Sequence, residues 1–257
     1  MNDVVTAFHE YFEIIDARSP ELLRDVFHLR YRVFCLEQRV PGFEAANYPT
    51  EMESDDYDRH SSHILLRHRP SGDFVGTARL VLPDPLNPEK PFPMEQYTQF
   101  DPALLDMSQL SRQHTGEISR LVIVRQFARR RSELPPALES GTGIEQWFPT
   151  KQRRFPHPML ALVVGIVRMS AEHNITQCLS AMDPSLNRLL GPFGLQFDPV
   201  GPMTNHHGPR RPYYIDLLKM LDRTYVNHNH IWELITDHGK VRLTPTECMP
   251  EHHRTLY

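Results

Sequence analysis

Apolar residues recur with two different periods in the first third of the chain. One helix face is predicted by the apolar positions Leu22, Val26, Leu29 and Val33. The preceding Ser19-Pro20-Glu21 is typical of a helix start, because serine caps the first turn and proline fits its first position. Residues 11–17, 63–67 and 74–82 instead have the pattern of strands, and the turn residues 70–73 join the last two in a hairpin.

The rest of the chain alternates between strands and helices. Residues 117–124 form the clearest strand, and strands are also predicted over 176–182, 195–200 and 213–221. Helices are predicted over 158–173 and 183–190. Residues 83–115 are rich in proline, which predicts a long surface or substrate-covering loop. This order predicts an α/β fold with a mixed central sheet and helices on both faces, followed by a polar tail over 222–257.

Composition narrows the class of protein. The 257 residues contain 40% hydrophobic and 23% charged residues, as in a soluble globular protein, and the net charge of −4 gives no reason to expect nucleic acid. The longest apolar run, residues 159–167, is too short to span a bilayer, and the first ten residues lack the pattern of a signal peptide. Three widely spaced cysteines fit a reducing compartment. We therefore expect a cytoplasmic protein without stable membrane insertion.

Candidate chemistry is concentrated in the acidic stretch from Glu53 to Asp58, which has four carboxylates in six residues. Three arginines lie within apolar segments: Arg30, Arg79 and Arg120. Because an unpaired charge in such a segment is costly, we expect the arginines and carboxylates to share one polar site. The alternatives are a solvated acidic loop and, for Arg30, a side chain that reaches water. Glu117 and Arg120 can both face that site only if their strand is bulged or Glu117 lies at its edge.

Four motifs in this order resemble the autoinducer synthases, which make acyl-homoserine lactones. The motifs are Leu29-Arg30-Tyr31-Arg32-Val33-Phe34, Glu53-x-Asp55-x-Tyr57-Asp58, Gly76-Thr77-Ala78-Arg79-Leu80 and Glu117-Ile118-Ser119-Arg120. Two phrases, at residues 29–37 and 62–69, are similar to exosortase (PEP-CTERM) system-associated acyltransferases and long-chain N-acyl amino acid synthases. The resemblance covers about residues 20–220. It implies one GNAT-like (acyl-CoA N-acyltransferase) domain of three layers over 1–257, with its core at 11–221.

The resemblance also implies a reaction, the transfer of a fatty acyl group from a thioester to the amino group of an amino acid or related small amine. The implied catalytic residues are Glu53, Asp55, Asp58, Arg79, Glu117 and Arg120, and the implied substrate-binding residues are Arg30, Phe34, Val122 and Val124. Glu53 or Glu117 would accept a proton from the amine. Backbone N–H groups between Val122 and Arg125 would stabilise the tetrahedral intermediate. Cys35 is expected to be a core residue and not a nucleophile.

A basic segment at 125–157 bears on the acyl donor. Its cations are Arg125, Arg129, Arg130, Arg131, Lys151, Arg153 and Arg154. They form either a solvated basic face or a docking surface for an acidic partner. The first part of this segment, residues 125–131, lacks the glycines that let a backbone approach the pyrophosphate of CoA. We therefore expect an acyl carrier protein, with its acyl-phosphopantetheine, as partner and co-substrate in preference to acyl-CoA, and no tightly bound cofactor.

Three alternatives stay open. Val40-Pro41 stands where autoinducer synthases carry a tryptophan, which disfavours a homoserine-lactone product without excluding it. The fold could also serve as a non-catalytic module that binds an acyl chain or a carrier protein. A metal site could use members of the set Asp56, Asp58, His60, His63, His206, His207, His252 and His253. The spacing of these residues fits poorly, and no metal is expected.

Overall fold

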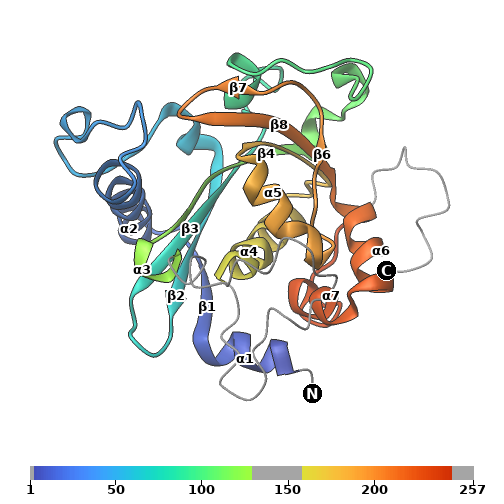
Figure 1. Cartoon of the computed structure of the whole chain (residues 1–257), viewed down its shortest axis with the longest axis horizontal. Helices are drawn as coiled ribbons and strands as arrows, with labels where there is room; N and C mark the ends of the chain where they lie inside the picture. The colour runs from blue at the N-terminus through green and yellow to red at the C-terminus, as the bar shows by residue number, and fades with distance from the viewer. Residues whose placement is uncertain (1–2, 129–157, 245–257) are drawn as a thin grey trace. The chain divides into compact units, whose positions relative to one another are not determined.

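A computed structural model describes residues 3–128 and 158–244 of the chain (Figure 1). Its eight strands form a sheet in the order β1-β2-β3-β4-β5-β8-β6, with β7 paired to β8. The strands are β1 (Phe12–Asp16), β2 (Ser61–His68), β3 (Phe74–Val81), β4 (Thr115–Ile123), β5 (Gln177–Met182), β6 (Asp198–Pro199), β7 (Thr204–Asn205) and β8 (Pro209–Asp216). Strands β4 and β5 pair in parallel, whereas β1–β2 and β5–β8 are antiparallel. The predicted mixed α/β sheet is confirmed.

Helices α2 and α5 begin where local sequence signals place them. They are α1 (Asp3–Tyr11), α2 (Pro20–Tyr31), α3 (Arg125–Ala128), α4 (Pro158–Glu172), α5 (Pro184–Leu190), α6 (Leu217–Asn227) and α7 (Asn229–Thr236). Ser19 caps α2 as predicted, because its side chain accepts a hydrogen bond from the Leu22 amide at 3.3 Å. Asp183 caps α5 in the same way through the Ser185 amide at 2.7 Å. Helix α2 continues as a π-helix over Arg32–Glu37.

The described residues belong to two compact units. Unit 1 comprises residues 3–54, 63–78, 120–128 and 158–163, and unit 2 comprises residues 55–62, 79–119 and 164–244. In unit 1, Val26 of α2 and Phe12, Ile64 and Leu66 of the strands are fully buried. In unit 2, a buried cluster contains Val81, Phe92, Met94 and Leu179. That the whole chain forms one GNAT-like domain stays a prediction.

The loop at 83–115 contributes to the core of unit 2. It contains three short 3-10 helices, Pro93–Gln96, Met107–Gln109 and Arg112–His114. Phe92 is 2% exposed and Met94 is fully buried. A plain surface excursion is therefore excluded, because this loop supplies two of the four buried residues of the cluster defined above.

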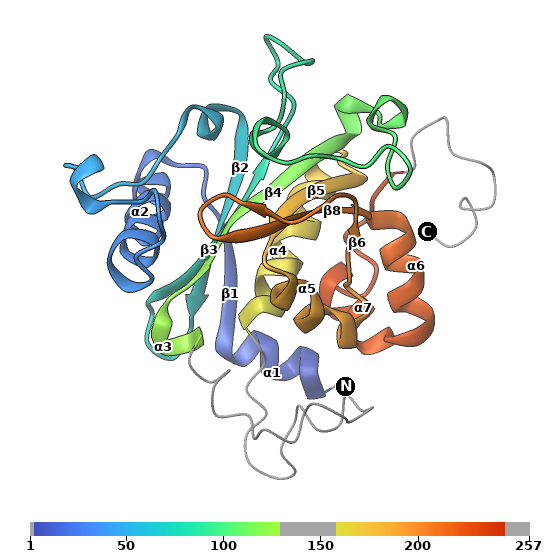
Figure 2. The same ribbon diagram turned by 45° about the horizontal axis from the view of Figure 1, so that its top comes forward.

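The C-terminal predictions need correction. The strand predicted over 213–221 ends at Asp216, whose carboxylate accepts hydrogen bonds from the Leu218 and Lys219 amides at 3.0 and 3.1 Å and so begins α6. The predicted polar tail starts inside α6, and α6 and α7 lie side by side (Figures 1 and 2). Ile231 and Ile235 of α7 are fully buried. The strand predicted over 195–200 shortens to β6, and α1 was not predicted.

Replacement of Asp216 with alanine tests this cap. The variant should lose about 1 kcal/mol of unfolding free energy, because two helical N–H groups lose their acceptor. Asp216→Asn should retain most of the stability, since asparagine caps as well as aspartate. Urea denaturation followed by circular dichroism measures both variants, and equal losses in the two would exclude the capping explanation.

Candidate active site

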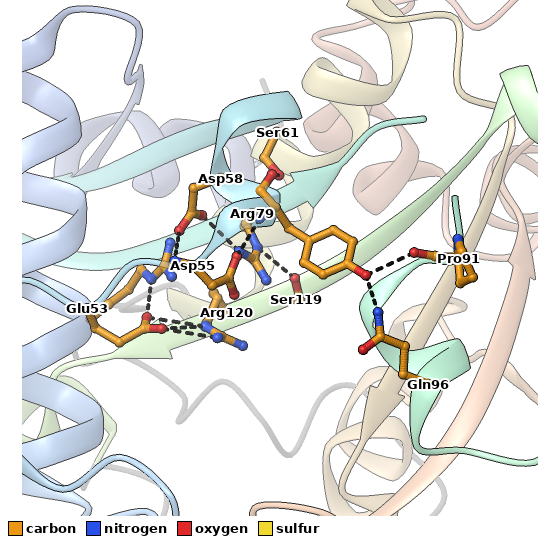
Figure 3. A network of polar contacts seen from close by, with 11 residues as sticks. Glu53, Asp55, Asp58, Ser61, Arg79, Pro91, Gln96, Ser119 and Arg120 are labelled. Atoms are coloured by element: carbon orange, nitrogen blue, oxygen red, sulfur yellow. Dashed lines mark hydrogen bonds and ion pairs between the residues drawn. The ribbon is translucent and has the colours of Figure 1, made fainter. Parts of the chain in front are cut away.

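The first polar cluster belongs to unit 1 and is called the Glu53 cluster, comprising Arg30, Glu53 and Arg120. Figure 3 labels Glu53 and Arg120. Arg30 Nε donates to Glu53 Oε2 at 2.5 Å. The Arg30 side chain is fully buried, and the Glu53 side chain is 1% exposed. Arg120 Nε lies 3.1 and 3.2 Å from the two carboxylate oxygens, and Arg120 Nη2 lies 3.0 Å from Oε1. One buried carboxylate thus accepts hydrogen bonds from two guanidinium groups.

Backbone geometry fixes the members of the Glu53 cluster. Arg30 lies in the last turn of α2, and the Glu53 amide donates to the carbonyl oxygen of Phe27, in the same helix, at 3.1 Å. Arg120 has φ of +51° in the middle of β4, a conformation that residues other than glycine rarely adopt. The strand is therefore irregular at Arg120, as the sequence required if Glu117 and Arg120 were to face one site.

Aromatic rings surround the two arginines. The guanidinium carbon of Arg120 lies 5.1 Å from the ring centre of Phe43 and 6.0 Å from that of Phe34. Arg30 lies over Phe27 at 5.3 Å. Rings at these distances attract a cation through their negative faces. Phe34, predicted to bind substrate, therefore contacts a member of the site, and Phe43 is an addition that sequence reasoning missed.

Electrostatics identify Glu53 as an ionised group. Burial is the largest single influence and raises the pKa of Glu53, but Arg30 and Arg120 together outweigh it and bring the pKa below its ordinary value of 4.5. Burial, and then the charge of Glu53, raise the pKa of the neighbouring Cys35 thiol and Tyr48 hydroxyl. A buried thiol with a raised pKa is a poor nucleophile, which agrees with the expectation for Cys35.

The second polar cluster belongs to unit 2 and is called the Arg79 cluster, comprising Asp55, Asp58, Arg79 and Ser119 (Figure 3). Arg79 Nη1 donates to Asp55 Oδ1 at 2.6 Å and to Asp58 Oδ1 at 2.8 Å, and its Nε donates to Ser119 Oγ at 3.0 Å. The Arg79 side chain is fully buried. Each buried arginine thus has carboxylate partners, but whether the two clusters form one shared site stays a prediction.

The acidic stretch folds into a short 3-10 helix, Asp56–His60, with Asp55 as its cap. The Asp55 carboxylate accepts from the Tyr57 amide at 2.9 Å, and Asp58 Oδ2 accepts from the Asp55 amide at 2.7 Å. Asp56 points away, with 82% of its side chain exposed beside the equally exposed Arg59. The alternative of a solvated acidic loop therefore applies to Asp56 alone among the four carboxylates.

The predicted catalytic carboxylates differ in access to solvent. Asp55 has 30% of its side chain exposed, against 6% for Asp58. Glu53 and Glu117 are 1% and 2% exposed. Glu117 Oε2 accepts a hydrogen bond from the Met94 amide at 2.8 Å. A proton acceptor for a dissolved amine has to be reached by that amine, so this comparison favours Asp55.

The predicted oxyanion-binding amides are partly engaged elsewhere. The Val124 amide donates to the Val75 carbonyl oxygen at 2.9 Å, and the Arg125 amide donates to Glu37 Oε2 at 2.7 Å. The side chains of Val122 and Val124 are 2% and 1% exposed, so they are core residues. A substrate-binding role for these two valine side chains is therefore disfavoured, because the substrate would have to displace core packing.

Most of the predicted carrier-docking residues lie outside the part of the chain that the structure describes. Of the predicted carrier-docking residues, the structure describes Arg125, at the start of α3. Outside the described residues lie the other six, Arg129, Arg130, Arg131, Lys151, Arg153 and Arg154, and two of the histidines considered for a metal site, His252 and His253. Over 3–128 and 158–244, no group of three or more His, Cys, Asp or Glu side chains could hold a metal ion. Over the same ranges, no helix is both long and apolar enough to cross a membrane.

Residues 29–135 match the model of the acetyltransferase (GNAT) domain. The match covers less than half of the chain, and over these residues the chain is similar to GNAT acetyltransferases. No curated protein sequence matches the chain significantly. The match spans all the residues of both polar clusters.

Solved structures with the same fold include two related kinds of synthase. BjaI, a CoA-dependent acyl-homoserine lactone synthase solved with SAM and isopentyl-CoA, is 18% identical, with 88% of each chain covered and a TM-score of 0.56. TofI, solved with an inhibitor and MTA, is 21% identical, with 83% of this chain and 95% of TofI covered and a TM-score of 0.53. FeeM, an N-acyl amino acid synthase from uncultured soil microbes, is 13% identical, with 82% and 93% covered and a TM-score of 0.51. The GNAT-like fold is thus confirmed, and the family match with this fold supports an acyltransferase enzyme.

Proposed function

We propose that the protein transfers a fatty acyl group from a thioester carrier to the amino group of an amino acid or a related small amine. The observation that carries this proposal is the half-buried Asp55 carboxylate, held by the fully buried Arg79. The match to the GNAT domain and the shared fold with FeeM, an N-acyl amino acid synthase, add support. Kinship with exosortase-associated enzymes and a cytoplasmic location stay predictions.

The proposed step needs a proton acceptor. The amine nitrogen attacks the thioester carbonyl carbon, the N–C bond forms, the C–S bond breaks, and the thiol leaves with a proton. The amine is mostly protonated at neutral pH and must lose a proton before it attacks. Asp55 is the accessible candidate, and a carboxylate beside an ammonium also binds it through charge. Arg79 holds Asp55 in place.

Glu53 has another part in this proposal. Both of its oxygens accept hydrogen bonds from guanidinium groups, and its lowered pKa makes it a weak base. The part of Glu53 is therefore to orient Arg120, and not to accept a proton. The Arg120 side chain is 18% exposed. Arg120 in turn is suited to contact a carboxylate or a developing negative charge on the substrate.

A contact in unit 1 supports an acyl carrier protein as the donor. The amide of Arg125, the first residue of α3 after β4, donates to Glu37 Oε2 at 2.7 Å, and Glu37 Oε1 also accepts from Arg32 Nε at 2.7 Å. Helix N-termini bind phosphates through such amides. A carboxylate here occupies the amide and disfavours a pyrophosphate, which CoA carries, whereas the phosphopantetheine arm of a carrier protein has a single phosphate.

A second candidate is synthesis of acyl-homoserine lactones. The fold shared with BjaI favours it, since BjaI is named as such a synthase. The absence of the tryptophan at Val40-Pro41 weighs against it. The two reactions share the acyl-transfer step and differ in the amine and in ring closure, so an analysis of products separates them.

The neighbouring aspartates Asp55 and Asp56 allow a matched test. Purified protein is incubated with acyl carrier protein or CoA thioesters and a panel of amino acids, and products are identified by mass spectrometry. We expect an N-acyl amino acid from the parent, a loss of about 10²–10⁴-fold in Asp55→Asn, and no loss in the exposed Asp56→Asn. Equal activity in the two variants would exclude Asp55 as the proton acceptor. Carrier binding without any product in the parent would support the binding module.

A further inference from the structure

The turn formed by residues 91–96 in the long loop of unit 2 is held from two sides. On one side, the amide of Met94 donates to Glu117 Oε2, in β4, at 2.8 Å. On the other, the Tyr57 hydroxyl donates to the Pro91 carbonyl oxygen at 3.0 Å and accepts a hydrogen bond from Gln96 Nε2. Figure 3 labels Pro91 and Gln96, the two ends of this contact in the turn. Residues from the acidic stretch and from β4 thus fix the same turn.

The turn is also rigid within the loop. Glu95 Oε2 accepts from the Phe92 amide at 2.6 Å and pairs with Arg112 at 2.8 Å. Arg112 Nη2 donates to the Lys90 carbonyl oxygen at 2.5 Å, and its guanidinium lies 4.1 Å from the Phe92 ring centre. Because the segment has this many internal contacts, it moves as one body with the residues that anchor it.

Both anchors are linked to the Arg79 cluster. The Tyr57 amide donates to the Asp55 carboxylate at 2.9 Å, so a single residue contacts both Asp55 and the turn. Glu117 lies two residues before Ser119, which accepts from Arg79 at 3.0 Å. Burial is the main cause that raises the pKa of Tyr57, and the negative charge of Glu117 raises it further.

We propose that Glu117 and Tyr57 are positioning residues: they anchor the 91–96 turn and thereby hold Asp55 in its working position. Glu117 is 2% exposed and its Oε2 already accepts from a buried amide, which makes it a poor candidate for the catalytic base that the motif suggests. The part of this inference that concerns Asp55 rests on the proposed function. The anchoring itself is independent of any activity.

Two substitutions at Glu117 separate an anchor from a base. Glutamine keeps an oxygen that can accept from the Met94 amide but cannot take up a proton at neutral pH, whereas leucine removes the acceptor. In amide hydrogen exchange, the Met94 amide should exchange about tenfold faster in Glu117→Leu and nearly as slowly as the parent in Glu117→Gln. In kinetics, Glu117→Gln should keep kcat within about tenfold of the parent, whereas a lost base costs about 10²–10⁴-fold.

Tyr57→Phe provides a milder variant in case Glu117→Leu does not fold. It should speed exchange in residues 91–96 and raise KM for the amine more than it lowers kcat, because the ring stays and only the hydroxyl anchor is lost. Glu89→Gln, at an exposed position of the same loop, is the control and should match the parent.

A loss of about 100-fold or more in kcat for Glu117→Gln with normal exchange would overturn the proposal in favour of a base. Unchanged exchange in both Glu117→Leu and Tyr57→Phe would overturn the anchoring. If the parent itself forms no product, the proposed function fails while the exchange data still decide the anchoring.

Discussion

Replacing Glu53 with leucine is expected to lower the free energy of unfolding by about 3–5 kcal/mol, because the variant removes the buried carboxylate to which the buried Arg30 guanidinium donates. Arg30 is fully buried and its Nε donates to Glu53 at 2.5 Å. Arg120 keeps 18% of its side chain exposed and can still be hydrated, so the cost falls mainly on Arg30. Urea denaturation at neutral pH measures the loss.

A double variant controls for the packing change. Arg30→Met should also destabilise, because it leaves Glu53 with Arg120 alone. Arg30→Met combined with Glu53→Leu removes the buried pair as a whole, and replacement of such a pair by apolar residues is often nearly neutral. The double variant should therefore be more stable than Glu53→Leu. A loss below about 1 kcal/mol for Glu53→Leu would show that Arg30 is not held by this charge.

The same pair predicts a dependence of stability on pH. The pKa of Glu53 is lowered in the folded protein from its ordinary value of 4.5. Its contribution is therefore fully present above about pH 4.5 and is lost as pH falls through the lower folded value. The parent should lose stability in this acidic range more steeply than Glu53→Leu, whose side chain has no proton to take up.

Local signals explain what could be predicted from the sequence. The cap at Ser19 and the 70–73 turn depend on residues close in the chain, so the start of α2 and the two strands of the β2–β3 hairpin were predicted closely. The need of buried arginines for carboxylates was also predictable, because it follows from the cost of an unpaired charge. The choice of partners was not, since Arg30 and Glu53 are 23 residues apart and only the fold brings them together.

The errors have the same physical origin. Tyr213 to Leu221 is apolar enough for a strand, but the Asp216 side chain captures two amides and starts a helix, a competition that hydrophobic pattern alone does not register. Helix α7 is short, and its buried face depends on packing with α6. Glu117 lies in a motif that suggests catalysis, and its contact with Met94 joins it to a loop without periodicity. Nothing local to Glu117 indicates that contact.

Replacing Arg120 with glycine is expected to separate activity from stability. At φ of +51°, a residue with a Cβ is strained by roughly 1–2 kcal/mol, and glycine relieves that strain. Arg120→Gly should therefore be more stable than Arg120→Ala by about 1 kcal/mol, although both lose the hydrogen bonds to Glu53. Both should lose about 10²–10³-fold in acyl transfer if the guanidinium contacts the reacting substrate.

Asn174 provides the matched control, because it has φ of +55° at an exposed position after α4. Asn174→Gly and Asn174→Ala should show a similar difference in stability from each other while acyl transfer stays at the parent level. Equal stability of Arg120→Gly and Arg120→Ala would mean that the strand is not strained at this residue. Full activity of Arg120→Gly would remove Arg120 from the chemistry and leave it a structural partner of Glu53. The combination we expect, a relieved backbone with lost activity, identifies strain that the fold tolerates in order to hold one guanidinium in place.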